Sequence, residues 1–216
     1  MNLSIKPSKR SALKALLAAA SLALLPLVSQ AADPSTPDGL IRQLSIETLE
    51  AVKADKAIQA GDTAKIVTLV DTKVMPHVNF QRMTSSAVGR FWRQATPEQQ
   101  KRLQDEFKTL LVRTYAGALS QVKDQTIALK PLRASAEDTE VVVKTEVRGK
   151  GDPIQLDYRL EKAGAVWKIY DVNVLGIWLA DQYRNSFAQE IGANGIDGLI
   201  KALADKNQKA ATGAKS

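Results

Sequence analysis

Few residues in this chain could do chemistry. Cysteine is absent and His77 is the single histidine among 216 residues, which excludes thiolate catalysis and metal sites built from thiolates or several imidazoles. A lone histidine beside Pro76, which ends a helical pattern, is more typical of a capping or surface residue than of a general base. The glycines within 192–198 follow no strand, so they predict a helix stop and restart and not a phosphate loop.

The carboxylates offer no clearer reaction centre. Asp157 and Glu161 alternate onto the polar face of a predicted strand, where they meet water. Asp171 lies in the following strand, and we expect it to pair with an arginine such as Arg184. The sequence also contains no Gly-x-Ser-x-Gly elbow. The residue types therefore favour binding over catalysis, although an enzyme stays an alternative.

From residue 126 onward the pattern is that of a sheet. Apolar and polar residues alternate in four segments, which we expect to be strands: 126–132, 141–147, 154–160 and 166–174. Short loops between them predict an antiparallel meander. Because the polar residues share one face of these strands, that face meets water and the other meets helices.

The last predicted strand is apolar on nearly both sides. Strict alternation places Trp167, Ile169 and Asp171 on one face and Val166, Tyr170, Val172 and Val174 on the other. Other parts of the fold must therefore cover both faces of this strand. Gly176 then breaks the alternation, and from Ile177 the apolar residues recur at the three- and four-residue spacing of a helix.

Helical spacing also precedes the sheet. The helical segments run over about 40–60, 66–75, 79–93 and 97–122. Thr96 is the strongest helix start, because Pro97 suits the first helical position and Gln99 can complete a capping box. The fold class is therefore α+β: helices, one antiparallel sheet of about four strands, then two more helices.

The first 31 residues have the pattern of a secretory signal peptide. Four basic residues precede an apolar run over 15–28, and Ser29-Gln30-Ala31 favours cleavage after Ala31. The run is too short to span a bilayer, which disfavours the alternative of a membrane anchor. Removing the four basic residues lowers the formal net charge from +7 to +3, so no nucleic-acid patch is implied. We expect one domain over 32–205 and a polar, solvated tail over 206–216.

Two long segments, 75–119 and 166–200, match a known family pattern. The matching residues are Phe80, Gly89, Trp92, Thr96, Phe107, Leu111 and Tyr115 in the first, and Trp167, Asp171, Gly176, Tyr183, Arg184 and Phe187 in the second. On these residues the chain resembles the MlaC family, also called the toluene-tolerance family, of periplasmic phospholipid carriers. It departs from the pattern at Asn79, where an acid is usual, and at Leu175 and Trp178, where a Glu-Gly-x-Ser run is usual.

The resemblance implies an NTF2-like fold, with the sheet curved around an apolar cavity. It implies a monomeric periplasmic carrier of glycerophospholipid between the outer and inner membranes, acting in outer-membrane lipid asymmetry and solvent tolerance. The implied partners are an inner-membrane ABC transporter complex with an MCE-domain subunit and an outer-membrane lipoprotein–porin complex. No cofactor is implied. The alternative is an NTF2-like enzyme or a binder of small hydrophobic molecules.

A phospholipid carrier needs a deep apolar cavity, because lifting two acyl tails from a bilayer removes on the order of 25 kcal/mol of burial at about 0.8 kcal/mol per methylene. The residues that we expect to line it are Phe107, Leu111, Tyr115, Val141, Val143, Val147, Leu156, Tyr158, Val172 and Val174. Periodicity alone does not distinguish a lined cavity from a filled core, and only the resemblance favours the cavity. Gly176 is a candidate gate, with a simple tight turn as the alternative.

Overall fold

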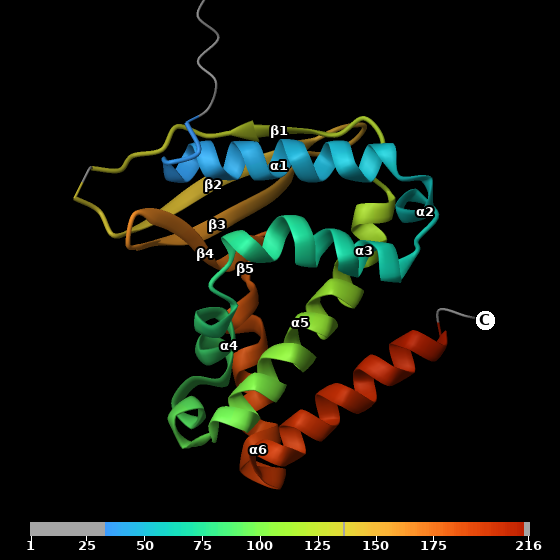
Figure 1. Ribbon diagram of the computed structural model, residues 1–216, viewed down its shortest axis with the longest axis vertical. Helices are drawn as coiled ribbons and strands as arrows, with labels where there is room; N and C mark the ends of the chain where they lie inside the picture. The colour runs from blue at the N-terminus through green and yellow to red at the C-terminus, as the bar shows by residue number, and fades with distance from the viewer. Residues whose placement is uncertain (1–32, 136, 214–216) are drawn as a thin grey trace, which may run out of the picture. The chain divides into compact units, whose positions relative to one another are not determined.

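The computed structural model describes residues 33–135 and 137–213, and the predicted signal peptide lies outside them. Before the sheet come α1 (Pro37–Ala54), α2 (Lys56–Gln59), α3 (Thr63–Leu69), the π-helical turn η1 (Val70–Val74), the 3₁₀ turn η2 (Met75–His77), α4 (Phe80–Val88), the 3₁₀ turn η3 (Gly89–Gln94) and α5 (Pro97–Ser120). The sheet comprises β1 (Thr126–Leu129), β2 (Glu140–Arg148), β3 (Ile154–Ala163), β4 (Val166–Val174) and β5 (Ile177–Trp178), and α6 (Leu179–Gly213) follows it. This is the predicted α+β class (Figure 1).

Side-chain caps explain where the longer helices begin. The Thr96 hydroxyl accepts from the Gln99 N–H at 3.2 Å, and the Gln99 side chain accepts from the Thr96 N–H at 3.0 Å, so the predicted capping box opens α5. Thr36 caps α1 in the same way, by accepting from the Gly39 N–H. The single helix predicted over 79–93 is wrong, because Gly89 takes a φ of 64° and divides it into α4 and η3.

The sheet is an antiparallel meander in the order β1-β2-β3-β4-β5. Four of its strands were predicted, and the fifth was not. β5 pairs Asn173 with Trp178 and Val174 with Ile177, so Ile177 is a strand residue and not the start of a helix. The helix α6 begins two residues later, at Leu179.

A β-bulge changes which residues of β4 face the same way. Leu160 of β3 lies opposite Ile169, and Tyr158 lies opposite Val172, with a register shift between them. Because Tyr158 and Leu160 are two residues apart on one strand, they share a face, and Ile169 and Val172 therefore share it too. The strict alternation predicted for this strand holds as far as Tyr170 and is wrong from Asp171 onward.

Helix α6 consists of two segments joined at Gly195, which has a φ of 72°. This is the break that the glycine spacing predicts. The second segment packs along α5 (Figure 1). It continues past the predicted domain boundary at 205 as far as Gly213, and Asn207 is buried, donating to the backbone and side chain of Glu106. The predicted boundary of the polar tail thus falls inside a helix.

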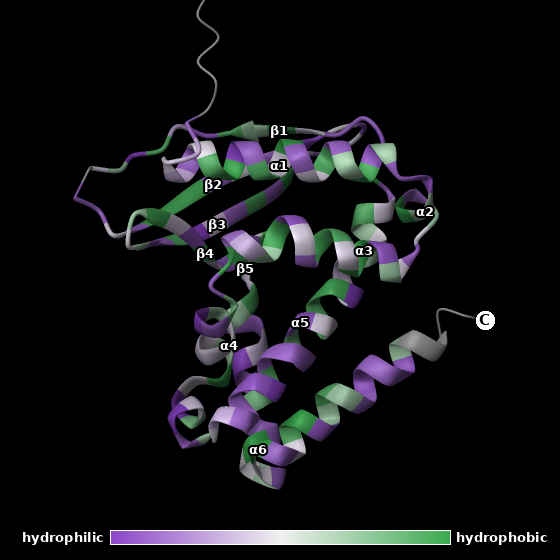
Figure 2. Cartoon of the chain, viewed as in Figure 1, coloured by the Kyte–Doolittle hydropathy of each residue, from purple (hydrophilic) through white to green (hydrophobic). Residues whose placement is uncertain are grey.

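Three apolar clusters hold these elements together. One joins α4, α5 and both segments of α6, a second joins α1 to the sheet, and a third joins α1, α2, α3 and α5. In Figure 2 apolar and hydrophilic residues alternate along α1 and along the second segment of α6, as expected of helices with one buried side. No helix among residues 33–135 and 137–213 is long and apolar enough to cross a membrane.

Candidate functional site

The inner face of the sheet is the side that packs against helices. Its side chains, fixed by the strand register, are Ile127 and Leu129 of β1, Val141, Val143, Thr145 and Val147 of β2, Ile154, Leu156, Tyr158 and Leu160 of β3, and Trp167, Ile169, Val172 and Val174 of β4. Seven of the ten predicted lining residues are in this set: Val141, Val143, Val147, Leu156, Tyr158, Val172 and Val174. The sequence therefore identified most of one apolar surface.

One end of this face is filled. Val143 and Leu160 are 1% and 0% exposed, and Val141 and Ile169 are also buried. These residues form one cluster with the apolar side of α1. We call this part of the inner face the closed end, because its side chains are covered.

The opposite end of the same face is not filled. Val147, Leu156 and Val174 are only half-buried, and Ile154, at the start of β3, is 46% exposed. We call this part the open end. An apolar surface that belongs to one face of one sheet is thus sealed at one end and reaches solvent at the other.

Aromatic residues of the helices form the facing wall. The Phe107 ring lies 5.0 Å from that of Tyr183 and 5.3 Å from that of Phe187, both edge-on, and 5.8 Å from that of Phe80. Phe107 is fully buried in this cluster together with Leu111, while Tyr115 is half-buried against it. The lining prediction missed Tyr183, Phe187 and Phe80, although their helical spacing could have indicated them.

Val172 joins the two apolar groups. It packs against the helical cluster of Phe107 and also against the sheet cluster of Leu160. Eight of the ten predicted lining residues belong to these two clusters, which share Val172 and Val78. The other two, Val147 and Leu156, lie at the open end.

Three tyrosine hydroxyls are among the polar groups of this interior. Burial raises the pKa of Tyr158, although its hydrogen bond with Ser45 opposes the rise. Burial likewise raises the pKa of Tyr115 and of Tyr183. All three phenols are therefore neutral at physiological pH. In this state they can donate or accept hydrogen bonds without placing a charge against an apolar ligand.

A surface pocket of about 440 Å³ lies elsewhere, at the start of α1. Residues of the α1 cap, the β1–β2 loop and the β3–β4 hairpin line it, among them Pro37, Leu132, Lys162 and Trp167. None of the ten predicted lining residues borders this pocket. It does not correspond to the predicted cavity.

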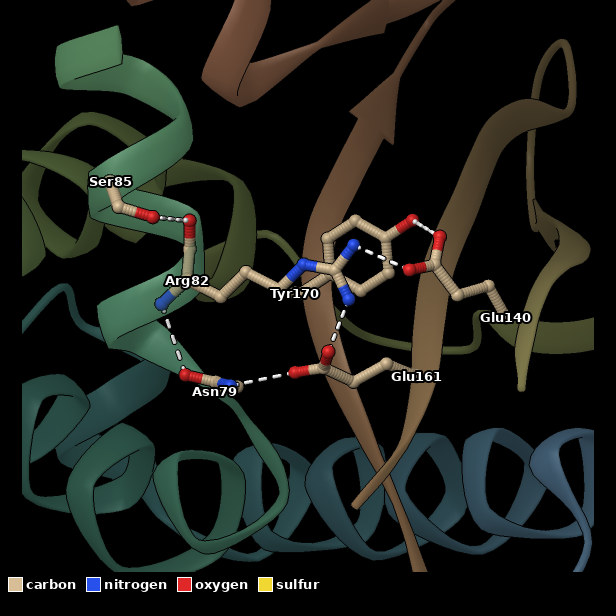
Figure 3. Close-up of polar contacts among 6 residues, drawn as sticks. All are labelled: Asn79, Arg82, Ser85, Glu140, Glu161 and Tyr170. Atoms are coloured by element: carbon tan, nitrogen blue, oxygen red, sulfur yellow. Dashed lines mark hydrogen bonds and ion pairs between the residues drawn. The ribbon is translucent and has the colours of Figure 1, made fainter. Parts of the chain in front are cut away.

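The outer face of the sheet carries a polar cluster that we call the Arg82 clamp (Figure 3). Arg82 of α4 pairs with Glu161, pairs with Glu140 at 2.6 Å, and lies 3.7 Å above the Tyr170 ring. Its hydrogen bond to Glu140 holds the pKa of that carboxyl below its usual range. Glu140 and Glu161 lie directly opposite each other in the strand register, so Arg82 neutralises a pair that would otherwise repel.

Asn79 explains one departure from the family pattern. Its side-chain oxygen caps α4 by accepting from the Arg82 N–H at 3.0 Å, while its amide donates to Glu161 at 2.6 Å. An aspartate could make the cap but would repel Glu161. The amide therefore suits a position that faces both a helix start and a carboxylate.

Two further carboxylates of the sheet, Asp171 and Asp157, are buried, and Asp171 also joins the sheet to α6. Asp171 pairs with Arg159 at 3.0 Å, and not with the expected Arg184, which pairs with Asp181. Asp171 also accepts from the Ala180 N–H at the start of α6, and burial raises its pKa. Asp157 was expected to meet water, but it is buried and accepts from the Thr145 N–H.

Gly176, the candidate gate, lies in a tight turn. Gly176 has a φ of 91°, its N–H donates to Asn173 at 2.8 Å, and an added Cβ would meet open space. Glycine is therefore needed here for its backbone conformation and not for room. Among the described residues no group of three or more histidine, aspartate or glutamate side chains could hold a metal ion.

Fold and site together define an α+β domain whose apolar sheet face is covered by helices and open at one end. A family model described as MlaC protein matches residues 42–205. The chain belongs to this family.

One solved structure and two further relatives support this family assignment. A phospholipid-binding protein from Ralstonia solanacearum, solved in complex with a phospholipid, is 46% identical with a TM-score of 0.78, over 81% of this chain and 98% of that one. The toluene tolerance protein ttg2D of Pseudomonas putida is 29% identical over 88% of this chain and 90% of its own length. The intermembrane phospholipid transport system binding protein MlaC of Haemophilus influenzae is 23% identical over 78% and 81%.

Proposed function

We propose that this protein is a periplasmic carrier that binds the acyl tails of a glycerophospholipid and shuttles the lipid between the outer and inner membranes. The observation that carries the proposal is the open end of the sheet face, which leaves apolar side chains half-exposed in a chain of this family. Exposed apolar surface disfavours the free protein and is satisfied by an apolar ligand. The phospholipid complex of the Ralstonia relative supports the same ligand class.

The tails enter at the open end and lie between the sheet and the aromatic wall. Val147, Leu156 and Val174 contact them first, and Val172 marks the depth at which the two clusters meet. The closed end is packed core and sets the limit of the site. The neutral tyrosines Tyr115, Tyr158 and Tyr183 offer hydrogen bonds to the ester and glycerol oxygens without a charge.

The carrier performs no catalysis. Its sole histidine lies in the short turn η2 and is half-buried, and Asp157 and Asp171 serve the sheet and the start of α6. Lipid moves by docking on the inner-membrane ABC transporter complex with its MCE-domain subunit and on the outer-membrane lipoprotein–porin complex. The turn at Gly176, between β4 and β5, acts as the gate.

Lipid content tests the proposal. The protein is purified without detergent from the periplasm, and native mass spectrometry is followed by extraction and lipid analysis. We expect a diacyl phospholipid adduct that extraction removes and added phospholipid restores. Protein that is empty as isolated and stays empty after incubation with phospholipid would overturn the proposal, whereas a smaller bound molecule would indicate the alternative of a small-hydrophobe binder.

A further inference from the structure

The β4–β5 hairpin presents apolar side chains to solvent at an unusual backbone position. Leu175 is 66% exposed and Ile177 is 54% exposed, which makes them the two most exposed large apolar residues of the described chain. Leu175 has a φ of 53°, and it is the single non-glycine residue with positive φ among those described. We call Leu175, Gly176 and Ile177 the hairpin tip.

The turn chemistry does not explain this leucine. Val174 pairs with Ile177 across a two-residue loop in which both residues have positive φ, as in a type I′ turn. Such turns favour Asn-Gly because asparagine tolerates the left-handed region and leucine does not. Leu175 therefore strains the backbone while its side chain lies in water. Two unfavourable terms at one residue indicate that the side chain serves a contact made outside this chain.

The hairpin tip continues the open end of the inner face. The Leu175 N–H donates to the Gln155 carbonyl at 3.1 Å, so the tip lies beside the start of β3. There Ile154 is 46% exposed, and Leu156 and Val174 are the half-buried pair of the open end. Apolar residues thus follow one another along the sheet from the tip to the inner face.

Basic residues lie at the same end of the sheet, on the outer face of β2 and in the β2–β3 loop. Lys130 and Arg148 share the single carboxylate of Glu146. Lys144 of β2 lies opposite Asp157 in the strand register, and Lys150 shares the β2–β3 loop with Asp152. The four bases exceed these three carboxylates by one charge, and a small apolar tip with net positive charge near it is the pattern of proteins that lie in the headgroup region of an anionic bilayer.

We propose that the hairpin tip inserts into the headgroup region of an anionic phospholipid bilayer, which sets the open end against the membrane. The proposal rests on the proposed carrier function, for which it names the lipid-facing surface. A bilayer suits the tip better than a protein partner does, because a stable protein interface buries about 800 Å² per partner and the two side chains of the tip supply far less. Weak insertion also suits a carrier that must leave again.

Flotation with lipid vesicles tests the proposal. The probes are vesicles of phosphatidylcholine alone and vesicles that also contain phosphatidylglycerol, each with delipidated and with lipid-loaded protein. Wild type should float with the anionic vesicles. Leu175→Asn should lower this partitioning about tenfold, the loss expected for removing a partly buried leucine. Because asparagine fits the turn, the same variant should unfold at the wild-type temperature or above it.

Val166→Asn is the matched control, since Val166 is 52% exposed at the other end of β4, and its partitioning should equal that of wild type. Ile177→Thr is a second tip variant and should weaken partitioning several-fold. Leu175→Asn that floats like wild type would overturn the proposal. So would wild type that binds neither vesicle, or that floats only when a membrane protein is incorporated, which would assign the tip to a protein partner. Lipid content, measured separately, reports on the carrier function itself.

Discussion

The two ends of the inner sheet face have the same strands and the same alternation, yet they differ in burial. At the closed end Val143 and Leu160 are almost completely buried, whereas at the open end Ile154 is 46% exposed. The closed end is fixed from both sides: α1 covers its inner face, and the Arg82 clamp binds Glu140 and Glu161 on its outer face, one residue along each strand from Val141 and Leu160. Further along the outer face a second arginine, Arg159, pairs with Asp171 and Asp181 and lies over the Trp178 ring, so the two ends differ in the cover of the inner face and not in outer-face ion pairs.

Covering a sheet face with helices and filling the space beneath them are separate properties of the fold. A filled end supplies stability, because each buried aliphatic side chain contributes about 1.5–3 kcal/mol. An unfilled end contributes less to folding but leaves apolar surface for a ligand. This division lets the protein bind lipid at one end without losing the packing that holds the fold at the other.

Two leucines of β3 give the sharpest test. Leu160→Ala at the closed end should lower the free energy of unfolding by about 2–5 kcal/mol, because it leaves a cavity in packed core. Leu156→Ala at the open end should cost about 1 kcal/mol or less, and should lower lipid content instead. Urea unfolding and lipid analysis of both variants measure the contrast. Equal losses of stability would show that the two ends are packed alike.

The Arg82 clamp gives the next largest effect. Arg82→Met keeps the length of the side chain but leaves Glu161, whose side chain is 18% exposed, facing Glu140 with no cation between them. We expect a loss of about 2 kcal/mol in the free energy of unfolding. Arg93→Met, at an exposed arginine of η3, should change it by less than about 0.5 kcal/mol. A similarly small effect at Arg82 would mean that the clamp contributes no more than an ordinary surface ion pair.

A charge at the open end should act on lipid and spare the fold. Val174→Glu places a carboxylate where acyl chains enter, and it should lower the lipid-to-protein ratio about tenfold or more, since burying an unpaired charge is far costlier than losing methyl groups. Circular dichroism should stay that of wild type because the side chain can reach solvent. Val166→Glu, exposed at the other end of β4, is the control and should retain its lipid. Normal loading of Val174→Glu would place the ligand elsewhere.

The sequence predicted the fold class, four strands and the capping box of α5, because all three depend on local pattern. It did not predict the bulge at Tyr170 or the strand β5, because a register shift depends on the pairing of β3 with β4 and leaves no periodic signal. It identified apolar residues of the inner face but not their division into closed and open ends. That division depends on where α1 lies across the sheet, which alternation along a strand cannot report.

The smallest expected effect is the pH dependence of the stability that the Arg82 clamp contributes. The Glu140 carboxyl has a usual pKa of 4.5, which the hydrogen bond from Arg82 lowers in the folded protein. A group whose pKa is lower when folded contributes stability above its unfolded pKa, and this contribution is lost as the pH falls from 4.5 through the folded value. Because the Glu140 side chain is 52% exposed, screening limits the contribution to a few tenths of a kcal/mol.

Glu140→Gln isolates this contribution from the other carboxyls. At pH 7 the variant should be slightly less stable than wild type, and the difference should vanish below the folded pKa, where both carry a neutral side chain. Asp171 works in the opposite direction, because burial raises its pKa above 3.8, so its ionisation lowers stability as the pH rises through that region. The raw pH profile therefore mixes opposing terms, and only the difference between wild type and Glu140→Gln, measured by urea unfolding across pH 3 to 7, reports on the clamp. A difference that stays constant with pH would show that Glu140 acts through its shape and hydrogen bonds and not through its charge.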